Sequence, residues 1–201
     1  MDKVKASLDI ITSALPLVPF DGWNTKTLGQ AALAAGYKKT DVVRVFSGGA
    51  IDAVDAYSRL CDQQMVEALA NYHLDTMKIR QRITSAVRLR LELQSKNREA
   101  VRRAVAMHSL PIYAHRGLRA LYETVDNIWY AIGDNSTDFN FYSKRLTLAA
   151  VYSATLRMWL DDNSPGCEAT WQFLDRRIED VMKFEKAKQQ AKSWFGKIKF
   201  T

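Results

Sequence analysis

Residues 125–162, VDNIWYAIGDNSTDFNFYSKRLTLAAVYSATLRMWLDD, contain two apolar helical patterns joined by a short polar segment. Apolar side chains recur every three or four residues on both sides of the polar break GDNSTD, which is the spacing of one helix face. The repeating positions are Val125, Ile128, Trp129 and Ile132 before the break, and Leu146, Ala149, Ala150, Ser153, Leu156 and Trp159 after it. Asp138 can cap the second helix, because a carboxylate there accepts backbone N–H groups. The stretch therefore predicts two helices that meet at a corner.

The same periodicity continues along the rest of the chain, and we find no convincing strand. Gly and Pro fall between the periodic segments, where they end helices. The sequence predicts an all-α protein of about nine helices. The expected N-terminal helices cover residues 3–15, 25–35, 41–46 and 50–73, with Thr25 as the cap of the second helix and residues 20–22 as a turn.

Residues 25–46 have the rhythm of a helix-turn-helix. A helix rich in small side chains ends at Gly36, and the short segment DVVRVF follows it. In DNA-binding versions of this unit the second helix reads the major groove. Two interpretations remain open: a DNA-reading element, or a scaffold that only packs the N-terminal end.

Composition sets the broad class. The 201 residues are 47% hydrophobic and 25% charged, as in an ordinary globular protein, and carry a net charge of +7. Such a charge favours polyanions as partners, either nucleic acid or an anionic membrane. No stretch is long and apolar enough to predict a transmembrane helix. Cys61 and Cys167 are far apart and lack metal-ligand spacing, so a reducing compartment is expected. The N-terminal residues predict a first helix, with no signal or transit peptide.

Residues 78–119 are rich in arginine and lysine, with only Glu92 and Glu99 as acidic side chains there. Most of these arginines are expected on solvated helix faces. An alternative is that a few of them contact phosphate headgroups or an acidic partner.

Signals for catalysis are scarce. The chain has no Gly-rich phosphate loop, no nucleophile elbow and no His-Glu-x-x-His motif. His73, His108 and His115 have no carboxylates at ligand spacing, and Cys61 lies on an apolar face. We therefore expect no catalytic residue, no metal site, no cofactor and no enzymatic activity.

The last residues, KFEKAKQQAKSWFGKIKF, combine an apolar stripe with many lysines. A basic helix with aromatic residues at its tip suits the surface of an anionic bilayer. The residues expected to contact the membrane are Lys192, Trp194, Phe195, Lys197, Ile198 and Lys199. The alternative is a helix docked on the protein's own core.

The helices between about residues 110 and 159 carry more large apolar side chains than a thin bundle needs. These side chains can line a slot for a chain-like ligand, or they can simply fill a core. The candidate lining residues are Met107, Leu118, Leu121, Val125, Trp129, Leu146, Ala150, Leu156 and Trp159.

The stretch VDNIWYAIGDNSTDFNFYSKRLTLAAVY resembles the ninth COQ protein family of ubiquinone biosynthesis, and so do DDNSPGCEATWQFLDRRIEDVMK and PFDGWNTKTLGQAALAAGY. This is an accessory, lipid-binding family on the TetR-like helical fold. The resemblance implies an isoprenoid quinone or another lipid as ligand and a role at the inner membrane, facing the cytoplasm in a bacterium or the matrix in an organelle. It also implies a homodimer, because TetR-like folds often dimerise through their last long helices.

The same resemblance implies a surface patch that docks the di-iron hydroxylase of the pathway. Matching the motifs places the patch at Asp126, Ile128, Asp138, Phe141 and Tyr142. Phe141 replaces a tryptophan that is usual in the family, which keeps an apolar anchor.

Taken with the resemblance, the sequence predicts three portions: a helix-turn-helix remnant at residues 1–48, a lipid-binding portion at 49–182 and a basic amphipathic helix at 183–201. The expected function is to bind an isoprenoid quinone intermediate at the membrane and present it to the hydroxylase. The alternative is a TetR-type transcriptional regulator with a small-molecule pocket, although nucleic acid is not the expected partner.

Overall fold

The described part of the chain is entirely helical. The computed structural model describes residues 1–134 and 139–198, with side chains described for residues 1–134 and 141–184. No strand occurs within those ranges, so the all-α prediction is confirmed. The α-helices are α1 (Lys3–Ala14), α2 (Val18–Asp21), α3 (Thr25–Ala34), α4 (Asp41–Val45), α5 (Ala50–Leu69), α6 (Ile79–Glu92), α7 (Arg98–His108), α8 (Ala114–Ala131), α9 (Phe139–Asp161) and α10 (Glu168–Ile198).

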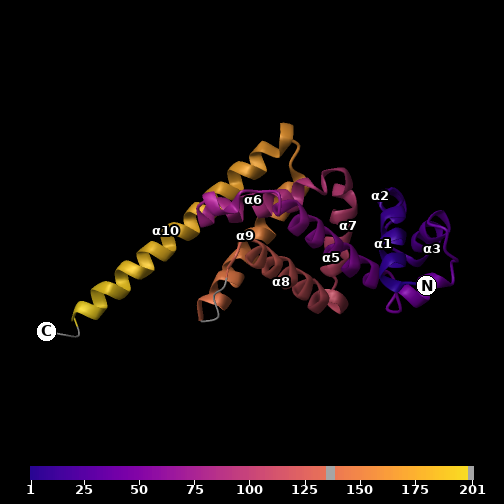
Figure 1. The fold of residues 1–201 in the computed structure, drawn as a ribbon, viewed down its shortest axis with the longest axis horizontal. Coiled ribbons are helices and arrows are strands. Elements are labelled where there is room, and N and C mark those ends of the chain that lie inside the picture. The colour runs from indigo at the N-terminus through magenta and orange to yellow at the C-terminus, as the bar shows by residue number, and fades with distance from the viewer. Residues whose placement is uncertain (135–138, 199–201) are drawn as a thin grey trace.

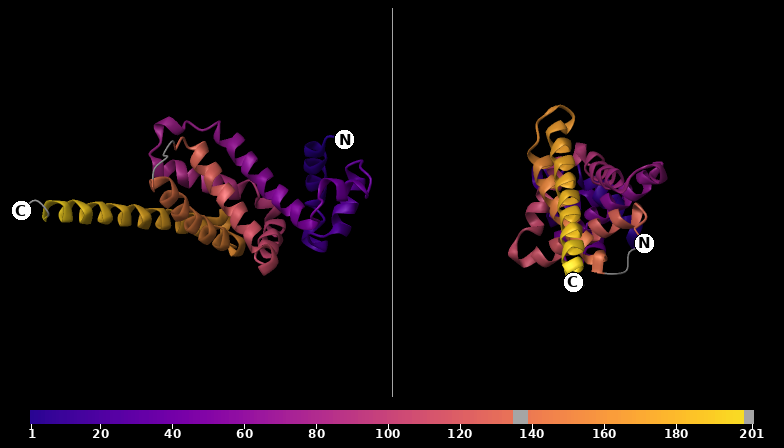
Figure 2. Two further views of the ribbon diagram at one scale, coloured as in Figure 1. Left: turned by 90° about the horizontal axis from the view of Figure 1, so that it is seen from below. Right: turned by 90° about the vertical axis from the view of Figure 1, so that its left-hand side faces the viewer.

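Helices α1–α4 form one end of an elongated molecule, and the C-terminal half of α10 projects from the opposite end (Figures 1 and 2). Helix α5 runs from the N-terminal end into the body, where it packs against α6 and α8. Helix α9 in turn packs against α8 and α10. One continuous apolar core joins all these helices; its largest fully buried side chains include Trp159, Tyr57 and Ile10.

Helix α2 is the element that the sequence prediction missed. Residues 20–22 were predicted as a turn, but Val18–Asp21 form a short helix with Pro19 in its first turn. Proline is tolerated there because the first N–H groups of a helix have no partner within the helix. Gly22 ends the helix with φ 77°, a conformation that glycine adopts without strain.

The prediction that Thr25 caps α3 was wrong. Asn24 occupies the capping position with an extended backbone, and its Oδ1 accepts the Thr27 N–H at 3.0 Å. Thr25 is already the first helical residue. The predicted helix over residues 50–73 ends earlier, at Leu69.

Six of the arginines expected on solvated faces instead tie helices together. Arg82 donates to the Ile132 carbonyl at 3.1 Å, and Arg103 donates to the Pro19 carbonyl at 2.8 Å. The other four are Arg90, Arg98, Arg102 and Arg116. Each guanidinium supplies several donors in a fixed plane, which suits a bridge between two elements. The solvated-face prediction was wrong for these residues.

Candidate functional site

A cavity of about 630 Å³ lies in the body of the protein, between α5, α6, α7, α8 and α9. Small side chains make room for it, because α7 and α8 face each other through alanines and Gly117. A Cβ on Gly117 would lie 2.9 Å from both Cβ and the carbonyl oxygen of His108, so only glycine allows this approach. The volume falls within the range of sites that hold a drug-sized ligand.

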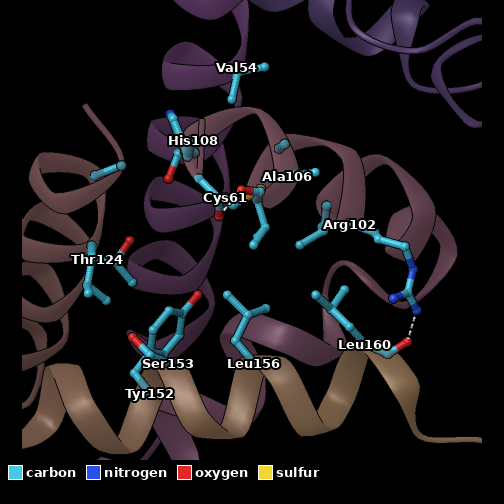
Figure 3. Close-up of a pocket in the computed structure, with 18 of the residues that line it drawn as sticks. Val54, Cys61, Arg102, Ala106, His108, Thr124, Tyr152, Ser153, Leu156 and Leu160 are labelled. Atoms are coloured by element: carbon cyan, nitrogen blue, oxygen red, sulfur yellow. Dashed lines mark hydrogen bonds between the residues drawn. The ribbon is translucent and has the colours of Figure 1, made fainter. Parts of the chain in front are cut away.

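The walls of the cavity are mainly apolar and lead to an open mouth. Leu156 and Leu160 of α9 lie opposite α7 and α5 (Figure 3). Leu118 of α8 is 68% exposed and marks the mouth, together with the exposed Arg157. An apolar ligand can therefore reach the interior from the surface.

The inner end of the cavity is polar. Arg90 of α6 is 5% exposed, and its Nε donates to Asp62 Oδ1 at 2.7 Å while its Nη2 donates to the Ser58 carbonyl at 3.3 Å. The Thr124 hydroxyl bonds the same carboxylate at 2.9 Å. Burial raises the pKa of Asp62, and the Arg90 guanidinium and the Thr124 hydroxyl oppose that rise.

Two tyrosines border this polar end. Tyr57 of α5 donates from its hydroxyl to Gln94 Oε1 at 2.8 Å. Tyr152 of α9 is 5% exposed, and its hydroxyl makes no hydrogen bond to any residue that the structure describes. Burial raises the pKa of Tyr152 to about 12, so the hydroxyl keeps its proton near neutral pH.

Beside the cavity, a charged network joins α7 and α8 to α5. His108 Nε2 lies 2.7 Å from Asp55 Oδ1, and Arg116 contacts both Asp55 and Asp52. Burial opposes the ionisation of Asp52, but the Arg116 guanidinium and the Gly48 N–H outweigh it and lower the pKa of that carboxyl. The carboxylate that pairs with His108 lies 53 residues earlier in the chain, so sequence spacing gave no sign of the contact.

Three of the nine predicted lining residues border this cavity: Leu118, Leu121 and Leu156. Val125, Trp129 and Trp159 lie in the core, and Met107 packs against it. Leu146 and Ala150 are exposed on the outer side of α9. These six positions do not border the cavity; on α9 the lining residues include Tyr152, Ser153, Leu156 and Leu160 instead.

Sequence reasoning missed Tyr57, Arg90, Thr124 and Tyr152. A signal existed: Asp62 and Arg90 interrupt apolar stripes, since Cys61 and Met65 flank the first and Ala86 and Val87 the second. A charged side chain on the buried face of a helix indicates a partner inside the protein.

The predicted partner patch is organised by a residue that sequence reasoning did not include. Arg145 donates to Asp126 Oδ1 at 2.6 Å, and its guanidinium lies 3.3 Å from the centre of the Phe141 ring. Tyr142 stands edge-on to Phe141 and is 68% exposed. Ile128 is fully buried, so its placement does not support a role as a surface anchor. Asp138 lies outside the described residues.

The predicted membrane contacts fall at the end of α10. The structure describes the backbone of Lys192, Trp194, Phe195, Lys197 and Ile198 as helical, and Lys199 lies outside the described residues. Across residues 1–134 and 139–198, none of the helices has the length and apolarity that a membrane crossing needs. No cluster of potential metal ligands occurs in the described part of the chain.

Comparison with known proteins gives the family. The COQ9 family model matches residues 114–185, which cover α8, α9 and the first half of α10. The "Ubiquinone biosynthesis protein COQ9, mitochondrial" of Homo sapiens is 30% identical over 191 residues, 92% of this chain. The chain belongs to the COQ9 family. The COQ9-B protein of Xenopus laevis is 32% identical over 195 residues, and the COQ9 protein of Drosophila melanogaster is 30% identical over 192 residues.

This COQ9-family chain spans 60% of the length of the human protein and 65% of the COQ9-B protein. Among solved structures it is similar to a TetR transcriptional regulator from Nitrosomonas europaea, with a TM-score of 0.69 and 17% identity over 86% of this chain and 95% of that chain. This similarity confirms the prediction of a TetR-like fold.

Proposed function

We propose that this chain is a lipid-binding accessory protein of ubiquinone biosynthesis, which binds an isoprenoid quinone intermediate and delivers it to the di-iron hydroxylase of the pathway. The relatives are named for ubiquinone biosynthesis, which supports the pathway. The observation that carries the ligand assignment is the 630 Å³ cavity with apolar walls and an open mouth. The hydrophobic effect favours an apolar ligand there, because binding removes its surface and that of the walls from water.

The described side chains support a binding role more than a catalytic one. The histidine that lines the cavity, His108, is paired with Asp55, and the carboxylate at the inner end, Asp62, is paired with Arg90. A general base needs a proton within hydrogen-bond reach in the substrate pose. The chemistry of the pathway therefore belongs to the partner enzyme in this proposal.

The exposed corner of α8 and α9 is the proposed docking surface for that enzyme. Phe141 and Tyr142 offer aromatic surface, and Asp126 adds a carboxylate held by Arg145. Binding energy at protein interfaces concentrates in aromatic anchors of this kind, rimmed by polar groups. The corner lies outside the cavity, so docking and lipid binding use different side chains.

The basic end of α10 is proposed to hold the protein on an anionic membrane, where the hydrophobic substrate resides. Each lysine near such a surface contributes on the order of 1 kcal/mol. Since the relatives are named as mitochondrial, the proposed location is peripheral to the inner membrane, on the matrix side in an organelle and the cytoplasmic side in a bacterium. The division into portions at residues 1–48, 49–182 and 183–201, and a homodimer, are part of this proposal.

Blocking the cavity tests the function directly. Ser153 and Ala150 are both exposed and lie one turn apart on α9, but Ser153 lines the cavity and Ala150 does not. Ser153→Trp should lower the binding of a short-chain ubiquinone by at least about tenfold, because the indole fills the space; Ala150→Trp should bind it as the unchanged protein does. Equal binding by both variants, measured by titration calorimetry, would exclude this cavity as the lipid site.

A further inference from the structure

The polar inner end of the cavity has a consequence for how a ligand is oriented, given the proposed function on which this inference rests. Lipid cavities are usually apolar throughout, with polar groups at the mouth. Here Arg90, Tyr57 and Tyr152 lie at the buried end, and the exposed Leu118 lies at the mouth. The mouth also carries the exposed Arg157, but the polar groups at the buried end are shielded from water, so an amphiphile bound with its polar end inward can satisfy them.

The hydroxyl of Tyr152 is the polar group at this end that a ligand can bind. Tyr152 is only 5% exposed. Its side chain points from α9 toward the space below Cys61 in the view of Figure 3. Among the described residues its hydroxyl has no hydrogen-bond partner. Because the cavity is open, water can bond this hydroxyl when no ligand is present. A ligand that displaces the water must supply an acceptor, or the hydroxyl loses its hydrogen bond.

The charges around Tyr152 select the chemistry of that acceptor. Arg90 is positive, but its Nε is bonded to Asp62 at 2.7 Å, so the pair is neutral as a whole. A second anion would leave an uncompensated negative charge in a buried site, which is costly. A neutral carbonyl oxygen avoids this cost and accepts the Tyr152 hydrogen bond, with the Arg90 guanidinium beside it.

The size of the cavity agrees with this orientation. About 630 Å³ suits a drug-sized group, which means a ring and the beginning of a long isoprenoid tail. The remainder of such a tail has to leave through the mouth, where Leu118 and Leu156 present apolar surface.

We propose that the inner end of the cavity is a carbonyl-recognition site, in which the Tyr152 hydroxyl donates a hydrogen bond to a ring carbonyl oxygen of the bound quinone and the isoprenoid tail extends outward past Leu118. The ring is then stored inside the protein, and transfer to the partner enzyme requires it to leave the cavity.

The test compares two probes on matched tyrosine variants of the full chain. One probe is a short-chain ubiquinone with two isoprene units; the other is a benzene ring with the same tail and no oxygen. Tyr152→Phe deletes only the unpartnered hydroxyl. Tyr130→Phe makes the same change on a side chain that is 78% exposed and outside the cavity.

Tyr152→Phe should weaken quinone binding by about three- to tenfold, the effect of one hydrogen bond. The same variant should bind the oxygen-free probe equally well or more tightly, because no hydroxyl is then buried without a partner. The infrared carbonyl band of the bound quinone should move toward its position in an apolar solvent. Tyr130→Phe should change none of these quantities.

Unchanged quinone affinity in Tyr152→Phe, or an equal loss for both probes, would overturn the carbonyl site and leave the proposed lipid-binding function intact. Failure of the unchanged protein to bind either probe would overturn both. Binding of the oxygen-free probe alone would overturn the carbonyl site, because the polar end would then reject the quinone.

Discussion

Arg90 on α6 donates from Nε to Oδ1 of Asp62 on α5 at 2.7 Å, with both side chains almost fully buried. This ion pair joins two helices at the inner end of the cavity and fixes the charge there. Removing one partner should lower the free energy of unfolding much more than removing both, because an isolated buried charge is far more costly than a neutral pair.

Removing only one partner should therefore be strongly destabilising. Asp62→Ala leaves the Arg90 charge buried and uncompensated, and we expect it to lower the free energy of unfolding by about 3–5 kcal/mol. The double change Asp62→Leu with Arg90→Met should recover most of that loss. Urea denaturation of the single and double variants measures the coupling, and additive losses would contradict the account.

Two glycines in helices should respond in opposite ways to alanine. Gly117→Ala places a methyl group 2.9 Å from His108 and should cost about 1–3 kcal/mol. Gly29→Ala meets only Lys39 side-chain carbons at 3.6 Å and should stabilise α3 by about 0.5–1 kcal/mol. Thermal unfolding of both variants checks the contrast. A loss of stability in the Gly29 variant would show that α3 is packed more tightly than described.

Asp162 should stabilise the junction of α9 and α10 in a pH-dependent way. Burial alone would raise its pKa, but hydrogen bonds from Ser164 and Thr170 outweigh burial and hold the pKa well below its usual range. Because the pKa of Asp162 is depressed in the folded protein, its ionised carboxylate stabilises the fold at pH values above the ordinary pKa of 3.8. This stabilisation is lost as the pH falls below that value. Asp162→Ala should cost about 2 kcal/mol at neutral pH.

The check is urea denaturation of the unchanged protein and Asp162→Ala at several pH values. The difference in the free energy of unfolding should be largest near neutral pH and should narrow below pH 3.8, where the Asp162 carboxyl of the unfolded chain takes up a proton while that of the folded protein stays ionised. A constant difference across this range would show that Asp162 stabilises the junction without its charge.

The α8–α9 corner should fail as a docking surface when it carries an added charge. Tyr142→Asp should abolish or strongly weaken binding to the pathway's di-iron hydroxylase, because a carboxylate replaces an exposed aromatic anchor. Its stability should remain unchanged, since Tyr142 is 68% exposed. Tyr72→Asp, on a side chain 40% exposed beyond α5, is the control. Equal hydroxylase binding by both variants in a pull-down would place the docking surface elsewhere.

The end of α10 should control attachment to membranes. Deleting residues 194–201 removes three aromatic side chains and two lysines from the tail, so co-sedimentation with anionic liposomes should fall. Neutral liposomes provide the control for charge. Undiminished sedimentation with anionic liposomes would show that the tail does not make the contact.

Helical periodicity was sufficient to predict most of the fold, because it marks one buried face per helix. The boundaries of α1, α3 and α4 lie within one residue of the prediction at each end. Helix α2 was missed because two prolines in residues 16–19 are typical of a helix stop, and a four-residue helix has no periodicity to detect. The same periodicity groups apolar residues on one face of each helix. For this reason the sequence could identify Leu118 and Leu121 of α8 and Leu156 of α9 as cavity-lining residues.

The sequence signals that Asp62 and Arg90 are charged residues on apolar helix faces, but not that they pair with each other at the end of a cavity. Arg90 lies in a segment with many arginines, and its burial depends on Asp62, which is 28 residues earlier in the chain. Tyr152 fits a core pattern as well as a cavity pattern, because the difference depends on the distance between α9 and α7. The sequence identifies a helix face, but only the packing of several helices leaves a space beside it.

The most direct test of lipid binding is native mass spectrometry of the protein purified from a ubiquinone-producing host, followed by lipid extraction. The account predicts a long-chain isoprenoid quinone, or a precursor with a ring carbonyl, at near-stoichiometric amount, and its loss in Ser153→Trp. A protein that is empty in all preparations, and that instead shifts duplex DNA at physiological salt, would contradict the account and favour a transcriptional regulator.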